Sequence, residues 1–273
     1  MNGFLRHIAA CNNARLPGGR VVLQLGSADV GWLAPGIADA LAARDGVERR
    51  NERIVIDEPV RLPELARTLS EDGWFRWRGE AFDVRASADS PVLTTIDRGA
   101  LPVFGIMASG VHVNGLVHRA DGLHLWVGYR ANDKPLDPGK LDHVVAGGIS
   151  AGMTAMDTLI KEAGEEAAIP PSLAAAAVPV GRITYAMERR EGLRRDCLYC
   201  YDLALPDNFS PHPADGEMER FELWPLARAF AAVRDGDDFK FNVALVLIDL
   251  FARLGLISGA DAATIRAALT PVP

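Results

Sequence analysis

In residues 147–170 a glycine-rich turn leads into an amphipathic helix, and this pattern limits the folds that the chain can adopt. Thr154 followed by Asp157 forms a capping-box pattern, so we predict that a helix begins there, and Pro170 with Pro171 closes it. Apolar residues recur at helical spacing and predict a buried stripe, formed by Met156, Leu159, Ile160, Ala163 and Ala167. The helix is therefore expected to bury one face and expose another.

The other face of this helix carries a group of carboxylates. Glu162, Glu165 and Glu166 stand at i, i+3 and i+4, so their side chains converge on one side. Neighbouring like charges cost an isolated helix roughly 0.2–0.5 kcal/mol per pair, and a bound cation would reverse that sign. Magnesium and manganese take hard oxygen ligands, water and phosphate oxygens. The alternative interpretation is a solvated glutamate-rich face.

The turn before the helix favours the metal interpretation. Gly147 and Gly148 permit close approach of the backbone to a ligand, and amides in such a turn can bind phosphate oxygens. Arg130, Lys134 and Lys140 lie just ahead of this turn. We predict that Arg130 and Lys140 contact the substrate together with the two glycines, with ordinary surface charge as the alternative.

From Gly147 onward the segment resembles the Nudix box, a pattern of one glycine, spaced glutamates and a late glycine. Six positions match this pattern: Gly147, Glu162, Ala163, Glu165, Glu166 and Ile169. In the Nudix family the paired glutamates and the glutamate before them carry the metal chemistry. The resemblance therefore implies that Glu162, Glu165 and Glu166 are catalytic residues and metal ligands for Mg²⁺ or Mn²⁺.

Three positions depart from the Nudix pattern. Met153 replaces the first glutamate, Lys161 replaces the arginine, and Ala168 replaces the late glycine. The replaced glutamate and arginine are mainly structural partners in the family, so the departures spare the implied metal ligands. Asp157 lies one turn before Lys161 and is expected to pair with it, to act as the capping acid, or to do both.

A second acidic segment follows at residues 215–226, which resemble the later Nudix strand that adds acidic groups to the metal site. Strand alternation places Glu217, Glu219 and Phe221 on one side. We expect Glu219 to bind metal and Glu217 to be catalytic, with edge-strand glutamates as the alternative. The general base is left open among Glu162, Glu217 and Glu219, because each could accept a proton from the attacking water.

The Ala-Gly-Gly start and the Thr-Leu-Ile-Lys-Glu run of the box resemble one Nudix branch more closely, that described as related to thiamine pyrophosphokinase. This resemblance implies hydrolysis of a small-molecule diphosphate, including thiamine diphosphate and its oxidised forms. A noncatalytic diphosphate sensor is the first alternative, because Met153 and Ala168 depart from the pattern. An isoprenoid diphosphate isomerase ranks lower, since that family needs a cysteine near the box and none lies between Cys11 and Cys197.

The 273 residues are expected to form two domains. Residues 1–101 are predicted to form a smaller α+β domain, which could form a wall of the substrate site. Residues 102–273 are predicted to form a Nudix-type α/β/α sandwich around a mixed sheet. Predicted helices cover residues 4–11, 35–44, 62–72 and 239–254. Predicted strands cover 21–25, 52–56, parts of 74–93 and 103–127, 182–202 and 217–223.

The composition limits the kinds of partner and compartment expected for the protein. The net charge of −7 argues against nonspecific nucleic-acid binding, which needs clustered Lys and Arg. No segment approaches the roughly 20 apolar residues that span a membrane. Cys197 and Cys200 lack a second ligand pair for zinc, and three cysteines suit a reducing cytoplasm, where we expect the protein. The six histidines are interpreted as structural or exposed, and a homodimer is left open.

Overall fold

The computed structural model describes residues 2–133 and 137–269. Its largest element is a mixed sheet of seven strands in the order β11-β12-β7-β8-β13, with β10 paired to β7 and β9 to β8. β7 and β12 run parallel, whereas the other neighbours in this sheet are antiparallel. The strands are β7 (Met107–Arg119), β8 (Gly122–Arg130), β9 (Leu141–Asp142), β10 (Val145–Gly148), β11 (Val178–Arg189), β12 (Gly192–Ala204) and β13 (Met218–Pro225).

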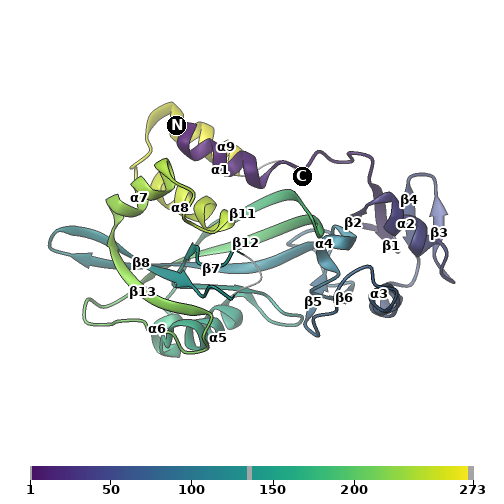
Figure 1. Ribbon diagram of the computed structural model, residues 1–273, viewed down its shortest axis with the longest axis horizontal. Helices are drawn as coiled ribbons and strands as arrows, with labels where there is room; N and C mark the ends of the chain where they lie inside the picture. Colours follow the sequence, from purple (N-terminus) through teal and green to yellow (C-terminus); the bar gives the residue numbers. More distant parts are fainter. Residues whose placement is uncertain (1, 134–136, 270–273) are drawn as a thin grey trace.

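Helices cover both faces of the large sheet, which confirms the predicted α/β/α sandwich (Figure 1). On one face, α5 (Ala155–Ala167) and α6 (Pro171–Ala174) pack against apolar residues such as Val111 and Tyr201. The other face holds α1 (Asn2–Cys11), α7 (Leu226–Asp235), α8 (Phe241–Arg253) and α9 (Gly259–Leu269). Because alternate strand residues point to opposite faces, each strand feeds both cores.

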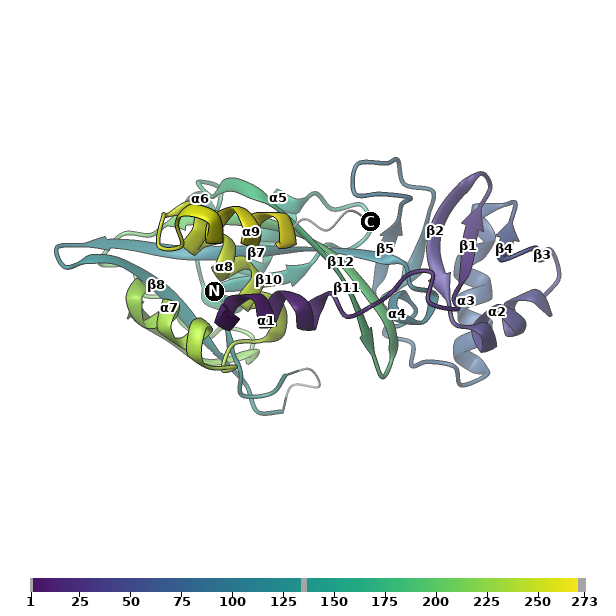
Figure 2. The ribbon, with the colours of Figure 1, turned by 90° about the horizontal axis from the view of Figure 1, so that it is seen from above.

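A smaller sheet lies at the far end of the molecule (Figure 2). Its strand order is β2-β1-β4-β3, and α2 and α3 pack beside it. The elements are β1 (Val21–Leu25), β2 (Ala28–Leu33), α2 (Pro35–Ala42), β3 (Glu48–Arg50), β4 (Arg53–Ile56), a 3₁₀ turn (Pro59–Arg61) and α3 (Leu62–Glu71). A separate hairpin of β5 (Ala81–Val84) and β6 (Thr94–Asp97) lies between this sheet and the large one in both views (Figures 1 and 2).

Several predicted elements need correction. In the predicted strand region 74–93, β5 is the one strand that the structure contains, because residues 74–80 instead form a turn and loop. The predicted strand run from residue 103 begins inside α4 (Leu101–Phe104), which has Pro102 in its first turn and ends at Gly105 in the left-handed conformation. Elements without a counterpart in the prediction include β2, β3, β6, α7 and α9.

The first helix packs against the C-terminal helices. α1 packs against α8 and α9, so the N- and C-terminal helices lie side by side (Figure 1). The division at residue 101 stays a prediction. Within residues 2–133 and 137–269, none of the helices combines the length and apolarity needed to cross a membrane.

Candidate active site

The acidic helix α5 begins where the capping box predicts. Thr154 Oγ1 accepts a hydrogen bond from the Asp157 amide at 3.1 Å, and donates to the Asp157 carboxylate at 2.6 Å. Asp157 therefore acts as the capping acid. Ala168 caps the other end with φ +52°, a left-handed backbone that favours glycine, which explains why the late Nudix position is usually glycine.

The three glutamates of α5 differ in burial. Glu166 is 3% exposed, whereas the side chains of Glu162 and Glu165 are 20% and 52% exposed. Glu166 Oε2 accepts a hydrogen bond of 2.9 Å from the amide of Ala146 in β10. The cluster therefore runs from a fixed, buried carboxylate to one in contact with solvent.

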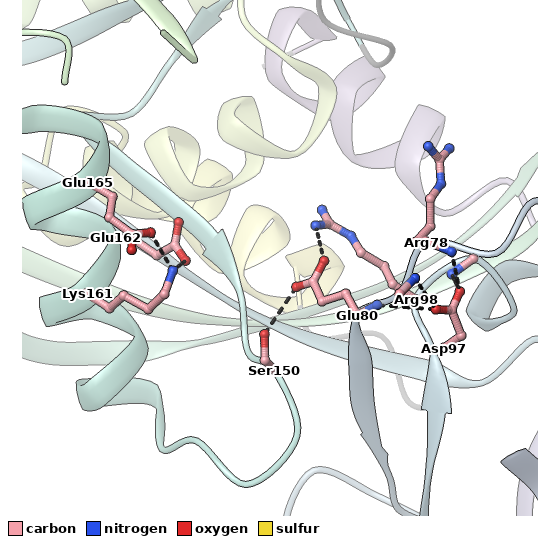
Figure 3. Close-up of polar contacts among 10 residues, drawn as sticks. Arg78, Glu80, Asp97, Arg98, Ser150, Lys161, Glu162 and Glu165 are labelled. Carbon is pink, nitrogen blue, oxygen red and sulfur yellow. Dashed lines mark hydrogen bonds and ion pairs between the residues drawn. The ribbon is translucent and has the colours of Figure 1, made fainter. Parts of the chain in front are cut away.

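Lys161 neutralises part of this cluster. Its Nζ donates to Glu162 Oε1 at 3.2 Å and also to Glu165 Oε2, as Figure 3 shows. The hydrogen bond to Glu165 is the main cause that raises the pKa of Lys161. The lysine at the arginine position of the Nudix pattern thus pairs with the cluster itself, and not with Asp157.

Burial shifts the proton affinity of two carboxylates. It raises the pKa of Glu162, although Lys161 opposes the shift. It also raises the pKa of Glu166 well above the usual value, and the negative charges of Asp142, Glu162 and Glu217 add to the effect. A divalent cation would favour the ionised forms, so these oxygens are suitable ligands for a hard metal ion.

Two glycines of the predicted phosphate turn lie in close contacts. A Cβ on Gly147 would stand 2.5 Å from Glu162 Cγ and 2.6 Å from its Cδ. A Cβ on Gly148 would stand 2.7 Å from Cζ of Phe82, a residue of β5. Glycine at these positions lets β10 approach the acidic helix on one side and the N-terminal hairpin on the other.

Glu217 directly precedes β13, and Glu219 is the second residue of this strand. The charge of Glu217 raises the pKa of both Glu162 and Glu166, which places it beside the α5 cluster. Glu219 is exposed and its Oε1 accepts a 2.7 Å hydrogen bond from Asn132 Nδ2. Glu217 thus acts electrostatically on the cluster, and the catalytic and metal-binding roles of both residues stay predictions.

The cations predicted to contact the substrate are engaged within the fold. Arg130 is buried, and its Nη1 donates to Asp142 Oδ2 at 2.8 Å. Lys140 Nζ donates to the carbonyl of Asp237 at 2.5 Å. Lys134 lies outside the described residues. Substrate contacts by Arg130 and Lys140 stay predictions and would require these bonds to rearrange.

Sequence reasoning missed a buried polar network behind the cluster. Nδ1 of His112 and Nδ1 of His143 lie 3.0 Å apart, and both residues are buried with Asp142. The Asn242 amide donates to His112 Nε2 at 3.3 Å, so His112 carries its proton on Nδ1 and donates it to His143. His143 Nε2 then donates to Asn114 Oδ1 at 3.1 Å.

The chain of hydrogen bonds assigns both histidines a neutral form. Burial lowers the pKa of His143 to about 4, and it lowers the pKa of His112 well below its ordinary value. Burial alone would raise the pKa of Asp142, but Lys240 and Arg130 outweigh it and bring the pKa to about 2. The ligand atoms of this trio lie within 4.8 Å of one another, but the two cations on Asp142 argue against a metal ion there.

Comparisons with known proteins found one family model and several similar proteins. A family model described as "Domain of unknown function (DUF4743)" matches residues 3–108. The chain is 42% identical over 180 residues to Nudix hydrolase 20, chloroplastic, of Arabidopsis thaliana, a match that covers 66% of this chain and 48% of that protein. It is 43% identical over 180 residues to Nudix hydrolase 24, chloroplastic, of the same plant, covering 66% and 49%.

The chain therefore spans about half the length of these curated relatives. Among solved structures, the NUDIX domain of Shewanella oneidensis NrtR, complexed with ADP ribose, is 14% identical with a TM-score of 0.44, covering 55% of this chain and 90% of that one. The two named relatives support a place in the Nudix hydrolase superfamily. The matching N-terminal family has no stated activity, so the relation to thiamine pyrophosphokinase stays a prediction.

Proposed function

We propose that this protein is a divalent-metal-dependent pyrophosphohydrolase that cleaves a diphosphate linkage in a small molecule. One observation carries the proposal: Glu162, Glu165 and Glu166 gather on α5 directly beside Gly147 of β10. The identity of 42% and 43% to two proteins named as Nudix hydrolases supports the same class.

The chemistry of the donor set fits Mg²⁺ or Mn²⁺. Glu162, Glu165 and Glu166 would hold the ion, with Glu219 as a further ligand from β13. A bound divalent ion neutralises diphosphate charge and lowers the pKa of a coordinated water. Glu166 is anchored by the Ala146 amide, so it would fix the ion relative to the sheet.

A carboxylate of the cluster takes the proton of the attacking water. Glu162, Glu217 and Glu219 are the candidates for this base, because a carboxylate within hydrogen-bond reach of the water could accept its proton. Three variants, each with glutamine at one of these positions, separate the candidates. The variant that lacks the base loses the acidic limb of its pH–rate profile, whereas loss of a ligand changes the metal dependence.

The proposed substrates are thiamine diphosphate and its oxidised forms, on the basis of the resemblance to that Nudix branch. In this proposal residues 1–101 wall the organic part of the substrate. The contact between the β5–β6 hairpin and the turn before α5 supports this placement, because Phe82 packs on Gly148.

The test is product release from a panel of diphosphates with Mg²⁺ or Mn²⁺ and with chelator. The panel comprises thiamine diphosphate, its oxidised forms, ADP-ribose, NADH, a nucleotide sugar and isopentenyl diphosphate. Metal-dependent cleavage of the thiamine compounds supports the full proposal, and cleavage of another member keeps the hydrolase and rejects the substrate. Tight binding without turnover would instead identify a sensor, and isomerisation of isopentenyl diphosphate an isomerase.

A further inference from the structure

The β5–β6 hairpin occupies backbone groups that a phosphate would otherwise use. The amide of Ala151 donates to the carbonyl of Ala81 at 2.8 Å, and the amide of Gly152 donates to Asp83 Oδ1 at 3.3 Å. Two amides of the glycine-rich turn are therefore already satisfied by the N-terminal part of the chain. A diphosphate bound beside this turn needs other donors.

The cations around the acidic cluster are also engaged. Lys161 bonds to Glu162 and Glu165, and Arg130 bonds to Asp142. A metal ion alone leaves part of the diphosphate charge uncompensated, and arginine is the side chain best suited to bind phosphate oxygens in pairs.

Arg98 is the cation that the hairpin brings to this turn. Its Nη1 donates to Glu80 Oε2 at 2.8 Å, and Glu80 Oε1 accepts from Ser150 Oγ at 3.1 Å. Figure 3 shows the Arg98 side chain extending over Glu80, with Ser150 between this pair and the glutamates of α5. The Arg98 side chain is 55% exposed. In the parts of the chain that the structure describes, its Nε and Nη2 make no hydrogen bond.

The base of Arg98 is held rigidly. The buried carboxylate of Asp97 accepts hydrogen bonds from the amides of Gly79 at 2.7 Å, Gly99 at 2.8 Å and Arg78 at 2.9 Å. The Arg98 amide donates to the Glu80 carbonyl at 2.7 Å. These bonds fix the backbone on both sides of the arginine, and the ion pair with Glu80 orients its guanidinium, which lowers the entropy cost of binding.

We propose that Arg98 binds the phosphate oxygens of the diphosphate substrate, through the edge of its guanidinium that Glu80 leaves open. This inference rests on the proposed function. It assigns to residues 1–101 a direct phosphate contact in addition to a wall for the organic group, and it makes the hairpin a determinant of substrate affinity.

The test compares Arg98→Ala and Arg98→Lys with a matched control, Arg78→Ala. Arg78 is exposed, and its guanidinium makes no ion pair within the described ranges and points away from Ser150 in Figure 3. Steady-state kinetics use whichever diphosphate the wild type cleaves. We expect Arg98→Ala to raise KM about 10- to 100-fold with kcat changed less than about threefold. Arg98→Lys should recover part of the loss, because it keeps the charge without the paired donors.

Calorimetric binding of inorganic pyrophosphate with Mn²⁺ separates this inference from the proposed function. If the wild type cleaves nothing in the panel, weaker pyrophosphate binding by Arg98→Ala than by Arg78→Ala still supports the phosphate contact. Equal kinetics and equal binding in the two alanine variants would overturn it and leave the hydrolase proposal standing. Thermal unfolding of each variant checks that loss of the Glu80 ion pair has not unfolded the hairpin, and Arg98→Lys provides the folded comparison if Arg98→Ala fails.

Discussion

Substitution of Gly147 by alanine tests the geometry of the acidic cluster directly. Gly147 lies within β10 and does not have a positive φ, so alanine introduces no left-handed backbone strain. The new Cβ would stand 2.5, 2.6 and 2.8 Å from Cγ, Cδ and Oε2 of Glu162. Ordinary carbon contacts lie at about 3.5–4.0 Å, so the carboxylate must move by about 1 Å.

A shift of this size is large for a metal ligand. Misplacement of a catalytic group by about 1 Å can cost about 100-fold in rate, equivalent to about 2.7 kcal/mol of transition-state stabilisation. We therefore expect Gly147→Ala to lower kcat/KM by about 100-fold and to weaken Mn²⁺ binding. The atoms that must move are the far end of a flexible side chain, so folding stability should fall by no more than about 1 kcal/mol. Kinetics, Mn²⁺ titration and urea unfolding measure the three effects on one preparation.

Gly164 provides the matched control. It is exposed on α5, two residues after Glu162, and a Cβ there would meet no atom within 4 Å. Gly164→Ala should raise helix stability by about 0.5–1 kcal/mol and leave kcat/KM within about twofold of the wild type. If Gly147→Ala matched this control in activity and Mn²⁺ affinity, the position of Glu162 would be irrelevant to catalysis, and its role as a ligand would be wrong.

Three further predictions follow from single contacts. Ala168→Gly should raise the free energy of unfolding by about 1 kcal/mol, because the residue has φ +52°, and an unchanged melting temperature would contradict this. His143 has a pKa of about 4 in the folded protein and an ordinary value of 6.5, so the unfolded state binds more protons between these values. Stability is then fully present above pH 6.5 and declines toward pH 4, by roughly 2 kcal/mol at pH 5. Urea unfolding at pH 7 and pH 5 should show a smaller decline for His143→Asn. Glu166→Gln keeps the volume and an acceptor for the Ala146 amide, so it should remain folded while metal-dependent turnover falls at least about 100-fold, and full turnover would reject Glu166 as a ligand.

Helix α5 was predictable because its signals are local. The cap at Thr154 and the apolar stripe depend on neighbours within one or two turns, and the observed helix runs from Ala155–Ala167 as the pattern requires. The different burial of the three glutamates was not predictable. It depends on β10, whose Gly147 lies against Glu162, and on Glu217 just before β13, whose charge raises the pKa of Glu162.

The histidine network depends even more on contacts between distant segments, which sequence patterns do not reveal. His112 and His143 are 31 positions apart and meet because β10 pairs with β7 in one particular register. Neither histidine lies in a spacing typical of a metal site or a catalytic pair. Strand alternation predicts that a residue faces one side of a sheet, but it does not say which strand lies opposite.

The N-terminal hairpin illustrates why contacts between distant segments escape sequence reasoning. Ser150 and Glu80 are 70 positions apart, and their hydrogen bond links the glycine-rich turn to a segment that was predicted to be mainly strand. The segment before β5 is irregular because its amides bind the Asp97 carboxylate in place of a neighbouring strand. A side chain can replace a sheet partner in this way when a loop must follow a fixed path.

Residues 1–101 contribute to the packing of the large sheet at two places. α1 belongs to the core on the α8 face of the large sheet, where Phe4 and Ile8 are buried, and His7 Nε2 lies 2.8 Å from the carbonyl of Val233. The hairpin binds the opposite end of the same sheet, beside the turn before α5. Removal of residues 1–101 would thus take these two buried apolar side chains out of the core, each contributing about 1.5–3 kcal/mol, and leave the Ala151 amide without its partner. Loss of activity in such a truncated chain could not distinguish a missing substrate contact from a weakened core. Single substitutions at Arg98 and Gly147 avoid this ambiguity, because each changes one contact at the acidic cluster while both packing layers remain in place.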